Sequence, residues 1–98
     1  MEKLSAVRRQ LETGQLDGAL SRLRGGALSA ARQRVVQVLD GFQRTFGAAE
    51  DTLVTLCSAP GRTEICGNHT DHQHGRVLAA AVNLDFLACA APNGTDTI

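Results

Sequence analysis

Apolar residues recur at helical spacing through the first half of the chain. Leu4, Val7 and Leu11 follow the i, i+3, i+7 spacing of one helix face, which predicts a helix over residues 2–12. Residues 15–24 repeat this spacing and predict a second helix. Residues 27–46 carry the strongest stripe, made of Leu28, Ala31, Val35, Val38, Leu39, Phe42 and Phe46. Glycines follow each of the three segments, so the pattern predicts three consecutive helices.

The period changes after residue 51. Residues 52–58 are rich in β-formers and predict a short strand. Pro60-Gly61 indicates a turn, and residues 62–66 predict a second short strand. Residues 67–75 are polar, hold all three histidines and predict a loop.

The apolar run 76–91 is compatible with a helix or a strand, and the turn pair Asn93-Gly94 directly after it favours a strand. Helices followed by strands predict an α+β fold. Four residues follow the turn, fewer than a return strand of matching length needs. We therefore expect an incomplete domain whose remaining chain is missing.

Composition and charge narrow the classes of protein. Apolar residues make up 43% of the 98 residues, but fourteen of them are alanine and only three residues are aromatic, so the chain can build only a thin core. The net charge of the whole chain is zero, which disfavours a nucleic-acid binder. The charge is divided, with +4 in residues 1–46 and −4 in residues 47–98. The chain lacks the run of about 18 apolar residues that a membrane span needs. Three sparse cysteines fit a reducing cytoplasm.

A dense polar segment follows the first predicted strand. It runs Ala59-Pro60-Gly61-Arg62-Thr63-Glu64-Ile65-Cys66-Gly67-Asn68-His69-Thr70-Asp71-His72. This segment resembles the N-terminal signature of galactokinases, in the GHMP kinase superfamily. The positions in register are Pro60-Gly61-Arg62, Gly67, His69-Thr70-Asp71, Gly75, Val77-Leu78 and Ala81-Val82. The resemblance covers residues 42–98, and residues 1–41 are interpreted as a helical extension.

The resemblance implies the first strands of a GHMP-kinase N-terminal domain and transfer of the γ-phosphoryl group of ATP, with Mg²⁺, to the anomeric hydroxyl of galactose. It also assigns roles to residues. Arg62 corresponds to the arginine near the reacting oxygen, where a guanidinium can stabilise developing charge. Asn68, His69 and Asp71 correspond to sugar contacts, and a carboxylate offers several acceptor sites to vicinal hydroxyls. Gly61, Gly67 and Gly75 are expected at structural turns.

Departures from the family pattern keep other hypotheses open. Asn68 stands where the family has a glutamate. The chain has no glycine-rich phosphate loop, so ATP and Mg²⁺ are expected only in the full-length parent. A non-catalytic sugar-binding or sensor module is the first alternative. A metal-binding loop is the second, although we expect no metal, and it would use His69, Asp71, His72 and His74.

Overall fold

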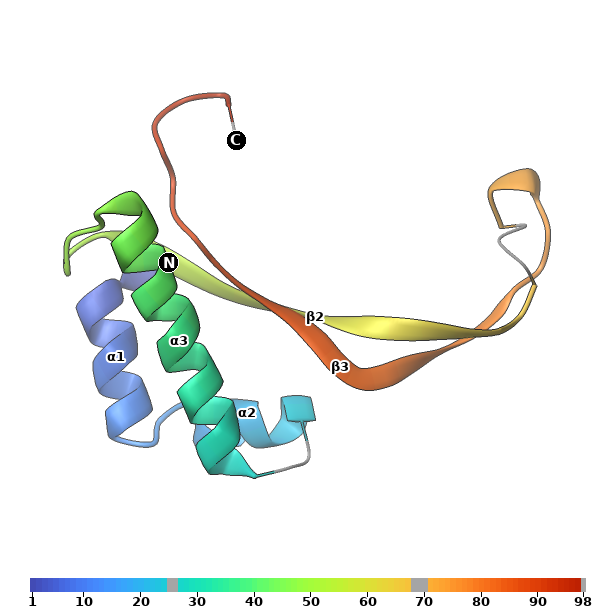
Figure 1. Ribbon diagram of the computed structural model, residues 1–98, viewed down its shortest axis with the longest axis horizontal. Coiled ribbons are helices and arrows are strands. Elements are labelled where there is room, and N and C mark those ends of the chain that lie inside the picture. The colour runs from blue at the N-terminus through green and yellow to red at the C-terminus, as the bar shows by residue number, and fades with distance from the viewer. Residues whose placement is uncertain (25–26, 68–70, 98) are drawn as a thin grey trace.

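The computed structural model describes residues 1–24, 27–67 and 71–97. Three helices and a three-stranded antiparallel sheet make an α+β fold, as the sequence predicts (Figure 1). The elements are β1 (Glu2–Lys3), α1 (Leu4–Glu12), α2 (Asp17–Arg24), α3 (Leu28–Phe46), β2 (Leu53–Cys66), the 3-10 helix η1 (Asp71–Gln73) and β3 (Leu78–Ala90). The helices gather at one end, and β2 and β3 extend away from them.

The hydrophobic core lies between α1, α3 and the start of β2. The residues of its main cluster are buried on three elements that are distant in sequence, and they are Leu4, Val7, Leu11, Val35, Leu39 and Val54. The first five fall on the helix faces that the apolar spacing predicts. Val54, at 1% exposure, is the contribution of β2. The helical segment and the strand segment therefore share one core.

The two-residue strand β1 joins α1 to the beginning of β2. Glu2 pairs with Val54, and Lys3 pairs with Leu53. The Leu4 amide then donates to the Thr52 carbonyl at 2.9 Å as α1 begins. The sequence pattern places residues 2 and 3 in the helix instead, because helical spacing carries no information about a strand formed with residues fifty positions away.

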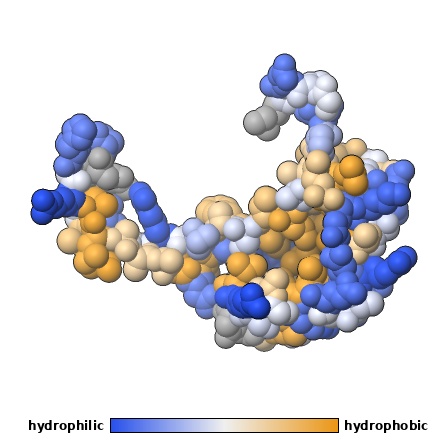
Figure 2. All heavy atoms as spheres, turned by 180° about the vertical axis from the view of Figure 1, so that it is seen from behind, coloured by the Kyte–Doolittle hydropathy of each residue, from blue (hydrophilic) through white to orange (hydrophobic). Residues whose placement is uncertain are grey.

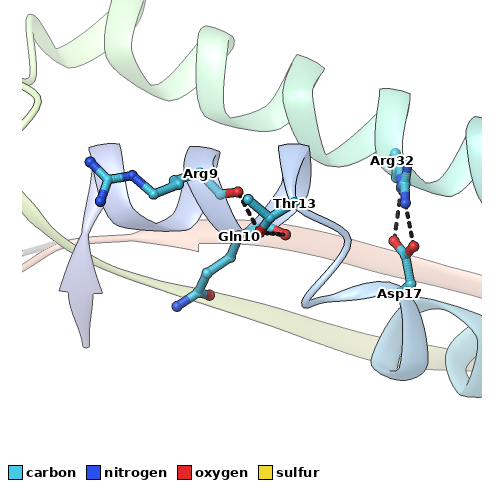
Figure 3. A network of polar contacts seen from close by, with 5 residues as sticks. All are labelled: Arg9, Gln10, Thr13, Asp17 and Arg32. Carbon is cyan, nitrogen blue, oxygen red and sulfur yellow. Dashed lines mark hydrogen bonds and ion pairs between the residues drawn. The ribbon is translucent and has the colours of Figure 1, made fainter.

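Polar contacts hold the helix connections in place (Figure 3). The Thr13 hydroxyl donates to the Arg9 carbonyl at 2.9 Å and closes the end of α1. Arg32 on α3 makes two hydrogen bonds to the Asp17 carboxylate at the start of α2, one of them 2.8 Å long from Nε. This hydrogen bonding raises the pKa of the Arg32 guanidinium above its ordinary value. The Arg32–Asp17 pair therefore links α2 to α3.

Beyond the core, β2 and β3 form a two-stranded antiparallel ribbon. Pairing runs from Thr55 with Ala90 to Cys66 with Leu78. In the order β1-β2-β3, the outer side of β3 is a sheet edge within the described residues. Apolar side chains are exposed along the ribbon (Figure 2). Phe86 is 80% exposed. The ribbon is therefore held mainly by its own pairing and by its base.

The turn predicted at Pro60-Gly61 is wrong, because β2 continues through it as a single strand. Pro60 pairs with Asp85, whereas Arg62 pairs with Ala81, so residues 82–84 lie opposite Gly61 in a β-bulge. A Cβ on Gly61 would lie 3.0 Å from Val82 Cγ2 and 3.2 Å from the Leu84 carbonyl oxygen. Proline lacks the amide of a regular ladder, and glycine permits this close approach, so the pair suits a bulge as well as a turn.

After β3 the chain turns at Asn93-Gly94, where Gly94 has φ 73°. The Asn93 side chain accepts from the Thr95 amide at 2.9 Å and donates to the Thr97 carbonyl at 2.6 Å. Residues 94–96 form bends, and residues 95–97 contain no strand. Among the described residues, no helix is both long and apolar enough to cross a membrane.

Candidate functional site

The signature residues lie on the outer half of the ribbon, away from the core. Arg62 follows the bulge directly, and its side chain is exposed. Thr63 and Glu64 continue the strand opposite Ala80 and Ala79. The bulge therefore stands between the anchored base of the ribbon and the strand segment that carries Arg62.

Gly67 ends β2 in a conformation that excludes other residues. Its φ is 127°, a value that L side chains rarely adopt. A Cβ at this position would lie 2.5 Å from Val77 Cγ1 and 2.7 Å from Val77 Cα. Since a side chain would overlap the facing backbone, glycine is required where the chain leaves β2.

The loop after Gly67 is described only in part. Asn68 and His69, two of the predicted sugar contacts, lie outside the described residues. Asp71 begins η1, and its side chain also lies outside the description. In the described part of the loop, His74 has a left-handed backbone conformation with φ 63°. The exposed Gly75, which was expected at a turn, follows it directly. The structure thus places Gly67 and the backbone of Asp71 beyond the end of β2, whereas Arg62 lies within the strand, paired with Ala81 and five residues before Gly67.

No metal centre is described for this loop. His72 and His74 are exposed. Over residues 1–24, 27–67 and 71–97, no group of three or more histidine, cysteine, aspartate or glutamate side chains is placed to hold a metal ion. His69, which the metal-binding hypothesis needs, lies outside these residues.

A polar network at the base of the bulge was missed by the sequence analysis. The Arg34 guanidinium on α3 forms an ion pair with Asp85 Oδ1 and donates to the Asp85 carbonyl at 2.6 Å. The Ser58 hydroxyl donates to Asp85 Oδ2 at 2.6 Å. The Asp85 side chain is only 12% exposed. One signal was available in the sequence, because Asp85 is the single charged residue in the run 77–91.

A separate apolar groove lies at the other end of the ribbon. Its volume is about 500 Å³, and residues near the end of α3 and the end of β3 line it, including Phe42, Phe46, Cys89 and Pro92. The Phe42 and Phe46 rings lie 5.1 Å apart, and Phe46 is 71% exposed. None of the predicted site residues lines this groove.

The three cysteines are free thiols, and Cys89 differs from the other two. Cys57 and Cys66 are exposed, whereas Cys89 is half-buried and packs against the core. Burial raises the pKa of the Cys89 thiol, and the nearby Cys57 raises it further. Cys89 is therefore the least suited of the three to act as a thiolate.

Comparison with known proteins identifies the signature segment. A family model described as the galactokinase galactose-binding signature matches residues 40–92, more than half of the chain. Neither a search of curated proteins nor a search of solved structures gave a match. The matched range covers the end of α3, the whole ribbon and the loop between its strands. The chain belongs to the galactokinase galactose-binding signature family.

Proposed function

We propose that this protein recognises galactose, through the end of the ribbon, as the sugar-binding part of a galactokinase-type kinase. The observation that carries the proposal is the match of the galactose-binding signature to residues 40–92. Within that range, Arg62 is exposed on β2, and Asn68, His69 and Asp71 follow the strand in the sequence. Under the proposal this segment is part of a GHMP-kinase N-terminal domain.

Each polar residue has a distinct task in this proposal. Asp71 supplies carboxylate oxygens that accept from sugar hydroxyls, including the axial one that separates galactose from its epimer glucose. Asn68 and His69 contribute further hydrogen bonds to the sugar. Arg62 stands near the anomeric hydroxyl, where its fixed positive charge stabilises a developing negative charge.

Under the proposal, ATP binds to other parts of the full-length kinase and not to this segment. ATP needs a loop of backbone amides around its phosphates, usually rich in glycine. The sequence of this chain contains neither of the common glycine-rich phosphate motifs, and Gly61 and Gly67 face Val82 and Val77 closely. These residues do not fit ATP, so we derive no phosphoryl-transfer step from them.

Calorimetric titration of the protein with galactose and with glucose tests the proposal. We expect galactose to bind more tightly, because a wrong epimer leaves a hydrogen-bonding group unpaired. Asp71→Ala should abolish that preference, while His74→Ala, in the same loop, serves as the matched control and should keep it. Equal affinity for both sugars would refute galactose recognition. Wild-type affinity in Asp71→Ala would remove that residue from the site.

A further assay separates the kinase from the sensor hypothesis. The substitution of asparagine at position 68 for the family's glutamate favours a module that binds sugar without turnover. Formation of galactose 1-phosphate from ATP would exclude a purely sensing role. Galactose binding with no phosphorylation by the complete protein would establish it.

A further inference from the structure

The side chains in the middle of the outer ribbon do little to set its pairing register. Arg62, Thr63 and Glu64 lie opposite three successive alanines, in the order Ala81, Ala80, Ala79. The alanines are alike, and all three are exposed. A strand that slips by one residue in either direction still leaves Thr63 opposite an alanine, so packing at this position does little to oppose the slip. Another part of the molecule has to fix the register.

Two register shifts interrupt the ribbon, one at the bulge between Pro60 and Arg62 and one further out between Glu64 and Cys66, and the first sets the pairing of Arg62. On the base side, Pro60 pairs with Asp85, and on the outer side Arg62 pairs with Ala81. The three residues 82–84 of β3 thus face the single residue Gly61. The position of Asp85 along β2 consequently determines which alanine faces Arg62.

Asp85 is held from two elements at once. Arg34 reaches it from α3 through both the carboxylate and the main-chain carbonyl, and Ser58 reaches it from β2 through the other carboxylate oxygen. A one-residue slip of β3 would turn the Asp85 side chain to the opposite face of the ribbon. The network is therefore compatible with only one register.

We propose that Arg34 and Asp85 are positioning residues for Arg62. They hold Asp85 opposite Pro60, and this keeps Arg62 paired with Ala81. The pairing fixes the surroundings of the Arg62 side chain on the ribbon. This inference rests on the proposed function insofar as Arg62 faces the reacting hydroxyl. It also gives a task to α3 in that site, although α3 carries none of the predicted sugar-contacting residues.

Nuclear magnetic resonance measures the register directly. In the wild-type protein, cross-strand contacts should join Thr63 to Ala80 and Glu64 to Ala79. Asp85→Asn keeps the size of the side chain and removes its charge, and Arg34→Gln removes the cation. In either variant we expect a second set of cross-peaks in which Thr63 contacts Ala79 or Ala81.

The Arg32–Asp17 pair provides a matched control. It also joins an arginine of α3 to an aspartate through two hydrogen bonds, but it leads to α2 and not to the ribbon. Arg32→Gln should lower the melting temperature and leave a single register. If Asp85→Asn and Arg34→Gln also keep a single register, the network is merely structural and the proposal is overturned.

A milder variant and a second measurement keep the test decisive. Should Asp85→Asn and Arg34→Gln fail to fold, Ser58→Ala removes one hydrogen bond and should give a smaller slipped population; a single register in it would overturn the proposal. Galactose affinity should fall in proportion to that population. If the register slips while the affinity stays at the wild-type value, the link to Arg62 is wrong. If the wild-type protein binds no galactose, the proposed function fails, and the register experiment still decides whether the network sets the pairing.

Discussion

Replacing Gly67 with alanine should open the outer end of the ribbon. The positive φ of 127° costs a residue with a side chain about 1–3 kcal/mol. The new methyl group would also lie 2.7 Å from Val77 Cα, whereas carbon atoms ordinarily approach to about 3.5–4.0 Å. The facing strand must therefore move, and the neighbouring Cys66–Leu78 pair is the one at risk.

The free-energy cost of the substitution is the sum of the conformational cost and the loss of backbone pairing. Loss of one ladder hydrogen bond beside Gly67 adds about 0.5–1.5 kcal/mol to the conformational cost. The total is about 1.5–4.5 kcal/mol, and it falls on an exposed part of the ribbon, where Ile65 and Leu78 are more than half exposed. The outer end should therefore open locally while the core around Leu39 stays folded.

Hydrogen exchange at single amides is the suitable assay. Amides of residues 64–66 and 78–80 should exchange at least about 10-fold faster in Gly67→Ala than in the wild type, since about 1.4 kcal/mol corresponds to a factor of ten. Gly94→Ala is the control, because Gly94 also has a positive φ but has no atom within 4 Å of its added Cβ. Exchange at residues 64–66 within threefold of the wild-type rate in Gly67→Ala would refute the reasoning.

Two further predictions concern the core and pH. Leu39→Ala, at a fully buried position, should lower the free energy of unfolding by about 2–5 kcal/mol in thermal denaturation, and a loss no larger than that of the half-exposed Val36→Ala would contradict the assigned core. Because the folded state raises the pKa of Cys89, it holds the thiol proton more tightly than the unfolded state does. Stability should therefore be full below the ordinary thiol pKa of about 8.5 and decline as pH rises above it. Urea titrations at pH 7 and pH 10 should show that Cys89→Ala removes this loss of stability. An equal loss in the variant would show that the Cys89 thiol is not its cause.

The helical half was largely predictable because burial there follows local spacing. Leu4, Val7 and Leu11 recur at helical intervals, and all three are buried in α1. The stripe on α3 was equally clear, yet Phe46 is 71% exposed at its end. Spacing shows which face of a helix is apolar, but whether another element covers that face depends on the tertiary arrangement.

The ribbon was harder to predict because its features arise between distant residues. Pro60-Gly61 has the composition of a turn, and only its pairing with β3 makes it a bulge. The Arg34–Asp85 pair spans fifty-one residues, and no spacing rule connects them. The signature residues, by contrast, are recognised as a string of fixed positions, which is why the family could be identified before the geometry of the site.

Within the described ranges the outer edge of β3 is unpaired, and this has a consequence for the aggregation of the protein. This thirteen-residue strand carries one charged side chain, that of Asp85, and Asp85 is turned inward to Arg34. Soluble proteins usually protect such edges with outward charges or prolines, and β3 has neither. An uncharged, apolar edge is a template for strands of other molecules, so the rate at which the purified protein aggregates should rise steeply with its concentration. Lysine at the exposed position 84, within the bulge, is the substitution expected to slow that growth.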